Sequence, residues 1–474
     1  MRWAVVSGFA KTAMLVGAVS VAAFVPDRAK SENLADALIS AYNTSGLLDQ
    51  YRALTRAADE DVAIAVSALR PVIDWSIRAG RDLQRIRNTG GTLTVDSRTS
   101  NFFTGLSFEQ LLYDGGAAFL GKQSAQEFVL ATRQTLLDIE QEVLFDAVVA
   151  YVNVLLQEEN VSLRQNNVRV LGEELRAAQD RFDVGEVTKT DVALAESRLA
   201  NARANLSVAE GDLRDARAQY TNAVGRAPGQ LAGAPRMPKF PASLAEATNI
   251  AMRNHPRILR FQHEVRAAEL GVQQARKALG PSATIRADVG LTDAIGTPQY
   301  NHNGSVALQF RQPIYQGGRL AAQVRRAMAQ RDSLKGVLIT TQRDITQLVN
   351  AAYVRVQAAR ATLVATNERV RAAQVAFDGI REEATLGART TLDVLTAEQD
   401  LLDAQTARVQ ARAEEIAAAY QLVQAQGLLT AERLGLAVQI YDPTIYYNLV
   451  KGAPANVSQR SKDLDRVLES LGKK

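Results

Sequence analysis

Residues 185–202 read GEVTKTDVALAESRLANA, and residues 387–404 repeat the pattern as GARTTLDVLTAEQDLLDA. The two stretches lie 202 positions apart in the chain. The residues that coincide are Gly185/Gly387, Thr188/Thr390, Asp191/Asp393, Val192/Val394, Ala195/Ala397, Glu196/Glu398, Leu199/Leu401 and Ala202/Ala404. A repeat of this length indicates a duplicated structural unit.

Each copy has the pattern of a turn between two helices. Gly185 and Gly387 can adopt positive φ and so end a helix at low cost. Thr188 or Thr190 can cap the next helix, and Asp191 adds negative charge to its first turn. From Val192 onwards, apolar residues and alanines recur at alternating steps of three and four. This heptad spacing predicts a long coiled-coil hairpin, present twice.

The composition favours long helices and argues against an enzyme. Proline is absent from residues 72–227 and again from 314–442, and an interior proline costs a helix about 3 kcal/mol or more. The absence of cysteine excludes disulfides and zinc–thiolate sites. The three histidines have no metal-ligand partners at suitable spacing, and His255 before Pro256 is most simply a local turn residue. We therefore expect no catalytic, metal or cofactor site.

The charge pattern and the N-terminal residues indicate the cellular location of the chain and argue against nucleic-acid binding. The net charge is only +4, and positive residues alternate with negative ones along the helices, which is typical of solvated faces and not of a nucleic-acid surface. Residues 1–23 carry Arg2 and Lys11, an apolar run and small residues at 21–23. This layout predicts a secretory signal peptide. The alternative, a membrane anchor, needs an apolar span of about 20 residues, and this run is shorter.

Four segments alternate apolar and polar residues with period two: about 71–82, 102–113, 282–292 and 304–315. One apolar and one charged face over about ten residues is the signature of transmembrane barrel strands. Strands of a soluble sandwich are the alternative, which the neighbouring long helices make awkward. The residues that we expect to face lipid are Trp75, Ile285, Val289, Val306, Leu308 and Phe310.

Each strand pair closes on a Tyr-x-Gly-Gly sequence, where a strand must become a helix. The glycines supply the backbone freedom that this junction needs. Helical stretches over 117–181 and 319–383 follow, each roughly 98 Å long at 1.5 Å per residue. The helices 188–224 and 244–279 together span roughly the same length, so that both can lie end to end beside one long helix. The junction residues are Tyr113, Gly115, Gly116, Tyr315, Gly317 and Gly318.

These patterns divide the chain into four parts. The signal peptide covers 1–23. A first repeat, 24–242, contains a helix over 31–69, the strands 71–82 and 102–113, the hairpin 117–224 and a linker, 225–242. A second repeat, 243–434, contains a helix, the strands 282–292 and 304–315, and the hairpin 319–434. Residues 435–474 form an equatorial segment, in which 437–445 has a β-like pattern, and a mobile tail.

The duplicated strand–strand–hairpin unit, the Tyr-x-Gly-Gly junction and the Gly-x-x-Thr-x-x-Asp-Val-x-x-Ala-Glu turn together resemble the TolC-like outer-membrane efflux family. The resemblance implies a homotrimer in a Gram-negative bacterium, with a 12-stranded barrel in the lipid of the outer membrane and a helical tunnel in the periplasm. It further implies an exit duct that passively conducts drugs or unfolded proteins. Its partners would be a periplasmic adaptor (membrane fusion) protein and an inner-membrane ABC or RND-type transporter, as in tripartite efflux or type I secretion.

By the same resemblance, the hairpin tips form a periplasmic gate. Asp191 and Arg389 match positions that pair between adjacent tips, and Asp393 matches a constricting acidic ring. Two residues depart from the family pattern: Thr396 replaces a second aspartate and Ala384 replaces a tyrosine. The tip residues with a possible role beyond packing are Lys189, Asp191, Arg389, Thr390 and Asp393, and the alternative is ordinary helix capping and surface charge.

Two other classes of protein share some of these features. A structural coiled-coil scaffold without channel activity would have the helices but would be water-soluble and lack β-structure. A periplasmic adaptor would need lipoyl-like and barrel segments between its helices, which the sequence does not show. An exit duct is therefore the leading interpretation.

Overall fold

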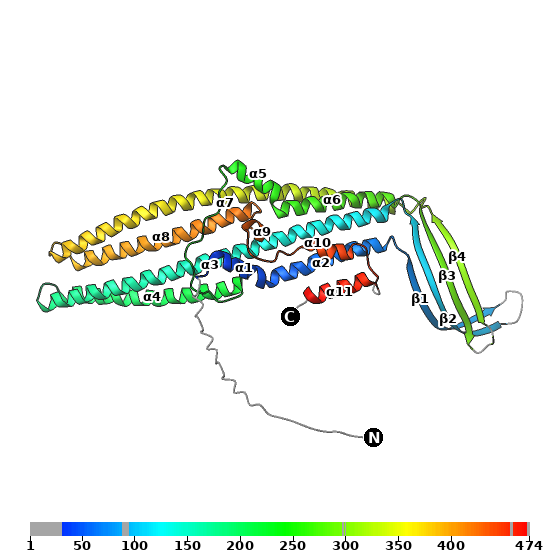
Figure 1. Ribbon diagram of the computed structural model, residues 1–474, viewed down its shortest axis with the longest axis horizontal. Coiled ribbons are helices and arrows are strands. Elements are labelled where there is room, and N and C mark those ends of the chain that lie inside the picture. The colour runs from blue at the N-terminus through cyan, green and yellow to red at the C-terminus, as the bar shows by residue number, and fades with distance from the viewer. Residues whose placement is uncertain (1–30, 88–93, 296–297, 299, 456–457, 472–474) are drawn as a thin grey trace, which may run out of the picture.

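The computed structural model describes residues 31–471, apart from 88–93, 296–297, 299 and 456–457. The expected signal peptide, 1–23, lies outside the described residues. The chain forms an elongated rod, with a sheet at one end and two long helical hairpins that run away from it (Figure 1). The fold is the predicted one: mainly helical, with one unit of two strands and a long hairpin that occurs twice.

The first copy of this unit runs through α1 (Leu34–Thr44), α2 (Gly46–Ser67), β1 (Val72–Arg87), β2 (Thr94–Tyr113), α3 (Ala117–Asp183) and α4 (Lys189–Val224). The second runs through α5 (Leu244–Asn254), α6 (Pro256–Lys277), β3 (Ser282–Ile295), β4 (Tyr300–Arg311), α7 (Arg319–Thr385) and α8 (Thr391–Ala425). Both long helices, α3 and α7, contain 67 residues. Three short helices follow: α9 (Ala431–Leu434), α10 (Pro443–Val450) and α11 (Gln459–Leu471).

The helices that precede each strand pair are interrupted, where the sequence pattern suggested continuous ones. Ser45 is extended and its hydroxyl accepts a hydrogen bond from the Leu48 amide, so that it ends α1 and caps α2. His255 has the same position between α5 and α6, with Pro256 opening α6. A residue before proline is pushed out of the helical region, which ends α5 at this point.

The long helix α3 is the axis on which the other helices pack. It contacts α4 over its tip half and α6 over its sheet half, as the helix lengths predicted, and it also contacts α2 and α8. Tyr151 of α3 and Tyr220 of α4 are fully buried in the main core. In the described part of the chain, no helix has a stretch long and apolar enough to cross a membrane.

Glu32 ties the start of the described chain to the linker between the two repeats. Its buried carboxylate accepts hydrogen bonds from the Tyr220 hydroxyl at 2.5 Å and the Gly229 amide at 3.0 Å, and it pairs with Arg226 at 2.7 Å. The backbones of Glu32 and Leu231 form a β-bridge beside these contacts. The charge is therefore fully partnered, which a buried carboxylate requires.

The sequence interpretation of residues 437–445 as β-like was wrong. Residues 437–442 are irregular, and residues 443–445 already form the first turn of α10. The Val438 amide bonds to the Leu436 carbonyl, and the Tyr441 amide to the Tyr42 hydroxyl at 3.4 Å. In the described part of the chain this segment pairs with no strand. Val438 packs against the main core, whereas Ile440 and Ile445 are exposed, so that the alternating pattern does not reflect a buried strand face.

The end of α4 gives a prediction about stability. Gly225 has φ +81°, and a Cβ there would lie 2.2 Å from the Thr44 hydroxyl. Gly225→Ala should lower the free energy of unfolding by about 1 kcal/mol or more, because both the positive φ and the contact disfavour a side chain. Gly211→Ala, inside α4 with nothing within 4 Å, is the control and should be neutral or stabilising. Thermal denaturation followed at 222 nm measures both; equal effects would contradict the assigned packing.

Candidate functional site

The two hairpin tips have the same backbone structure. At the first tip, Gly185 has φ +80°, and the Glu186 amide bonds back to the Arg181 carbonyl. At the second, Gly387 has φ +77°, and the Ala388 amide bonds back to the Glu383 carbonyl. The Gly185 amide also bonds to the Phe182 carbonyl, and the Gly387 amide to the Ala384 carbonyl. Two such bonds around a left-handed glycine form the Schellman ending of a helix. The repeated glycines are thus required by the turn itself.

The aspartates of the tips are helix caps in this chain. Thr188, and not Thr190, caps α4, and the Asp191 carboxylate accepts from the Thr188 amide at 3.0 Å and from its hydroxyl at 2.7 Å. Thr390 and Asp393 make the same capping box at α8, with distances of 3.0 and 2.8 Å. Each box satisfies amides that the start of a helix leaves without partners.

These hydrogen bonds set the electrostatics of the tips. The hydroxyl and amide of Thr188 lower the pKa of Asp191, and the amide and hydroxyl of Thr390 lower the pKa of Asp393. Within one chain, the pKa values of these aspartates are therefore shifted downwards. A ring of like charges would shift the pKa values of its members upwards. Both side chains are ionised at neutral pH, and Lys189, two residues before Asp191, is exposed.

Arg389 has a partner that the sequence did not suggest. Its guanidinium donates to the Glu383 carboxylate of the same tip at 2.7 Å, which raises the pKa of Arg389. The structure holds one chain, so that the expected pairing of Arg389 with Asp191 of a neighbouring tip stays a prediction. Of the two departures from the family pattern, Ala384 is buried between α7 and α8, whereas Thr396 is exposed.

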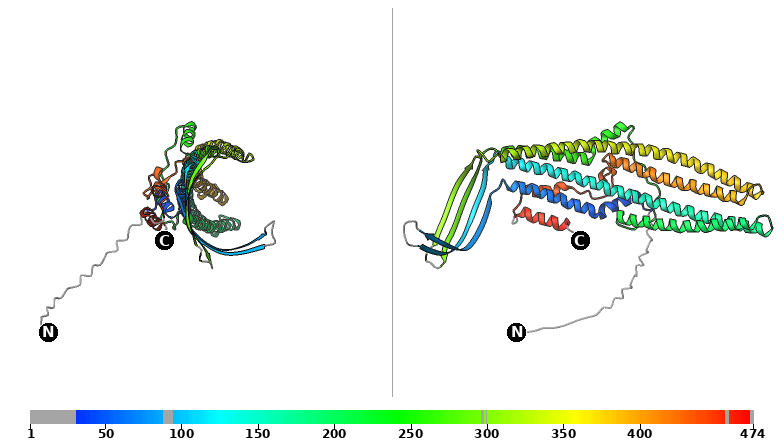
Figure 2. Two further views of the ribbon diagram at one scale, coloured as in Figure 1. Left: turned by 90° about the vertical axis from the view of Figure 1, so that its right-hand side faces the viewer. Right: turned by 180° about the vertical axis from the view of Figure 1, so that it is seen from behind.

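The sheet has one apolar and one polar face. Its order is β1-β2-β3-β4, all antiparallel. Trp75 lies opposite Leu106, which lies opposite Val289, and Ile285 lies opposite Leu308. Directly opposed residues share a face, so that the six residues expected to face lipid lie together. The other face carries Asp74, Asp288 and an Arg286–Glu109 pair at 3.2 Å. Figure 2 shows that the sheet is curved.

The strand-to-helix junctions use their paired glycines as turns. Gly115 and Gly116 have φ of +67° and +89°, and Gly317 and Gly318 have φ of +58° and +80°. The second glycine of each pair is the N-cap of the long helix. Tyr113 and Tyr315, which precede the two turns, are exposed at the base of the sheet.

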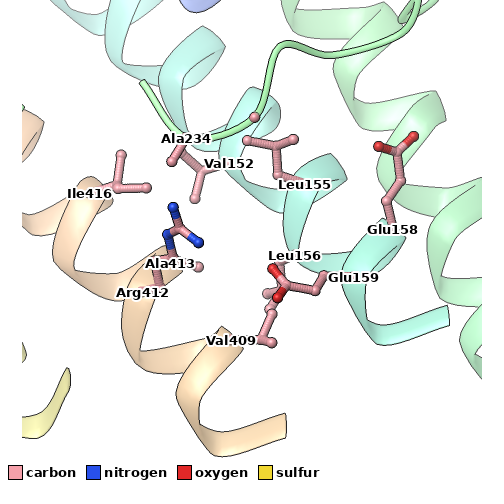
Figure 3. A pocket seen from close by; sticks show the side chains of 11 residues that line it. Val152, Leu155, Leu156, Glu158, Glu159, Ala234, Val409, Arg412, Ala413 and Ile416 are labelled. Carbon is pink, nitrogen blue, oxygen red and sulfur yellow. The ribbon is translucent and has the colours of Figure 1, made fainter. Parts of the chain in front are cut away.

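Sequence reasoning missed the contact between the two hairpins. Glu398 of α8 is buried and accepts a hydrogen bond from the Asn167 side chain of α3. A nearby cavity of about 300 Å³ lies between α3 and α8 beneath the linker (Figure 3). Val152 and Ile416 form part of its wall, and Arg412 projects into it. The polar residues at heptad spacing on α3, Asn160, Asn167 and Glu174, were the available signal.

Comparison with known sequences places most of the chain in one family. The profile of the family described as "Outer membrane efflux protein" matches residues 40–226 and 247–428. The outer membrane efflux protein BepC of Brucella suis biovar 1 is 38% identical over 425 residues, which cover 89% of this chain and 91% of that protein. The alkaline protease secretion protein AprF of Pseudomonas aeruginosa is 26% identical and covers 75% of this chain and 74% of its own length.

Comparison with solved structures establishes the same fold. The CmeC outer membrane channel of Campylobacter jejuni superimposes with a TM-score of 0.73, at 17% sequence identity. The match covers 90% of this chain and 90% of that chain.

The tip geometry predicts which threonine matters for the turn. Thr188→Ala removes the capping hydroxyl, which stabilises a helix end by about 1 kcal/mol. Hydrogen exchange of the amides of residues 189–192 should then accelerate about fivefold, since 1.4 kcal/mol corresponds to about tenfold. Thr190→Ala is the control and should leave the exchange unchanged. Acceleration in Thr190→Ala alone would show that the capping residue is assigned wrongly.

Proposed function

Because this chain belongs to the outer membrane efflux protein family, we propose that it is the outer-membrane exit duct of a tripartite efflux or type I secretion system. It passively conducts drugs or unfolded proteins from an assembly that spans the periplasm to the outside. The chain is an outer-membrane protein that reaches into the periplasm, and its family consists of channels and not of enzymes. The observation that carries the proposal is the sheet with one apolar face, joined directly to hairpins roughly 100 Å long.

The uncovered surfaces of the single chain support a homotrimer. β1 and β4 are the open edges of the sheet, and every residue of β4 is exposed. A bacterial barrel needs at least about eight strands, and an unpaired strand edge is not tolerated in lipid. Along α7, the first buried residue is Ile345, so that its sheet half buries no residue although α6 lies beside it. Three copies would join their sheet edges into a barrel of 12 strands. Each copy would also cover the sheet half of α7 of its neighbour.

Partners and cargo follow from the same premise. A duct that reaches from the outer membrane into the periplasm needs a periplasmic adaptor and an inner-membrane ABC or RND-type transporter to supply cargo. One relative is named for efflux and another for protease secretion, so that the two cargo classes, small molecules and proteins, both fit the chain.

We also propose the division of the chain and the role of the tips. The signal peptide is 1–23, the repeats are 24–242 and 243–434, and 435–474 is an equatorial segment and tail. Asp191, Lys189, Arg389, Thr390 and Asp393 form the periplasmic gate. Their support is that all five lie within a few residues of the turns, at the end of the molecule farthest from the sheet (Figure 1).

Reconstitution into planar bilayers tests the proposed function. The purified, detergent-solubilised full-length protein should form trimers and give discrete conductance steps. A protein that stays soluble and monomeric without detergent, and gives no conductance, would instead support the structural scaffold.

The two faces of the sheet give a second test. Leu308→Arg places a charge on the proposed lipid face and should destabilise the folded barrel in the membrane by roughly 2–4 kcal/mol near the midplane. Gln309→Arg, one residue on and on the opposite face, is the control and should cost far less. Folding into lipid vesicles, followed by the heat-modified gel mobility of the barrel, measures both. A larger effect at Gln309 would reverse the proposed facing.

The tips give a third prediction. If Arg389 exchanges Glu383 for Asp191 of a neighbouring tip in the trimer, Arg389→Ser removes one attraction per subunit and should raise the conductance. Asp393→Asn removes a ring of charge and should weaken cation selectivity without opening the tips. Single-channel recordings separate the two effects. Unchanged conductance in the first variant, with unchanged selectivity in the second, would leave these residues as helix caps alone.

A further inference from the structure

The two hairpins, α3–α4 and α7–α8, hold each other through polar contacts made by α3. The Glu159 carboxylate lies 3.9 Å from Arg408 of α8, the Asn167 amide donates to Glu398 of α8, and Glu174 pairs with Arg381 of α7 at 3.2 Å. Positions seven or eight apart return to the same side of a helix after two turns. One side of α3 therefore carries all three contacts to the second hairpin.

Among these contacts, only the one between Asn167 and Glu398 is buried on both sides. Asn167 is 4% exposed and Glu398 is 7% exposed, whereas Arg381, Arg408 and Glu159 are each at least 38% exposed. The equivalent of Glu398 in the first copy of the repeat, Glu196, is exposed on α4. The burial of Glu398 is thus not a property of the duplicated hairpin. It arises because α8 packs against α3.

The contact lies in a loosely packed seam. The cavity of about 300 Å³ at Val152 and Val409 lies on its sheet side (Figure 3). A second cavity, of about 110 Å³, lies on its tip side between Glu174 and Val394. Atoms that line a cavity lack dispersion partners, so that α3 and α8 adhere less firmly here than the helices within each hairpin.

The charges around Glu398 make the packed arrangement costly. Burial raises the pKa of Glu398; Asn167 and Arg164 of α3 oppose this shift, whereas Asp403 of α8 and Glu174 of α3 add to it. Arg381, the nearby cation of α7, is paired with Glu174. A buried carboxylate with a single neutral donor is poorly compensated. Separation of the hairpins would hydrate it.

From this geometry we propose that Asn167 and Glu398 form a latch that holds the α7–α8 hairpin against the α3–α4 hairpin. Its release frees the second tip, which carries Arg389 and Asp393, to move away from the first. The latch lies along the shaft of the hairpins, apart from the residues at the tips. The part that concerns conduction rests on the proposed function, whereas the contact between the hairpins does not.

An exchange of donor and acceptor tests the latch. Asn167→Asp places two carboxylates together and should separate the hairpins, because like charges that share a buried site repel. Adding Glu398→Gln restores one amide and one carboxylate with their positions exchanged, and should restore the packing. Glu398→Gln alone removes the buried charge and should strengthen the packing. Glu196→Gln, at the exposed equivalent in α4, is the matched control.

Disulfide formation measures the contact directly, because the chain contains no cysteine. Leu171→Cys on α3 and Leu395→Cys on α8 occupy one buried cluster. In the full-length trimer, Asn167→Asp should lower the rate of disulfide formation by about tenfold or more, since an uncompensated buried charge is strongly destabilising. The exchanged pair should recover the original rate. An unchanged rate in Asn167→Asp, or no recovery in the exchanged pair, overturns the latch.

A variant that does not assemble leaves the test intact. If Asn167→Asp yields no trimer, Glu398→Gln decides: a rate of disulfide formation above that of the parent supports the latch. A rate equal to that of the parent or of Glu196→Gln overturns it.

Conductance in planar bilayers tests the link to conduction. Asn167→Asp should raise the open fraction, and the exchanged pair should return it to the parental value. Channels that conduct equally in all variants would overturn the latch and leave the duct. An absence of conductance in every variant, including the parent, would overturn the proposed function, and the disulfide rates would still decide the contact.

The pH dependence has a definite sign. The pKa of Glu398 is raised where the hairpins are packed, so that the packed state binds a proton more strongly than the separated state. Acidification should therefore favour packing and lower the open fraction, and this favourable contribution is lost as pH rises through the raised pKa. Glu398→Gln should reduce this dependence, whereas Glu196→Gln should keep it. Equal pH profiles in the parent and Glu398→Gln would overturn the latch.

Discussion

The packing of α3 against its neighbours is the interaction on which the rest of the structure depends. This helix of 67 residues contacts α2 and α6 beside the sheet, α4 towards the tip, and α8 across the hairpins. A single long helix in water is stabilised mainly by burial of an apolar stripe and little by its own propensity. α3 accordingly carries buried residues from Val129 to Ala178, along most of its length. The stacked shorter helices are what makes this continuous burial possible.

The second long helix shows what the single chain leaves incomplete. α7 has the same length as α3, but its buried residues begin only at Ile345, and β4 beside it is exposed throughout. The two copies of the repeat therefore differ chiefly in their surroundings. The long helix of the first copy, α3, lies inside the chain with α2, α4, α6 and α8 around it, whereas α7 lies at its margin. In the proposed trimer, a neighbouring copy would cover this margin.

The tip aspartates have a structural role that is independent of the proposed gate. Asp191 and Asp393 occur at the same place in both copies because each completes a capping box with a threonine three residues earlier. That requirement alone explains the repeat of the motif. The capped carboxylates also keep their charge, because the hydrogen bonds of the caps lower their pKa values. A gate built from these residues would thus use charges that the turn already holds in place.

The sequence by itself determined the duplicated unit, the alternating strands, the positive-φ glycines of the turns and the family. These features depend on local spacing, such as the heptads after Val192 or the period of two around Leu308, which the order of residues carries directly. The sequence also indicated the shared apolar face of the strands, which the register later aligned. Only the tertiary structure decided that Ser45 ends one helix and begins the next, that Arg389 pairs with Glu383, and that residues 437–445 form no strand. It alone buried Glu398 while it left Glu196 exposed, although both occupy the same position of the same motif. Burial depends on which helix packs across the seam, and that contact joins residues 231 positions apart in the chain.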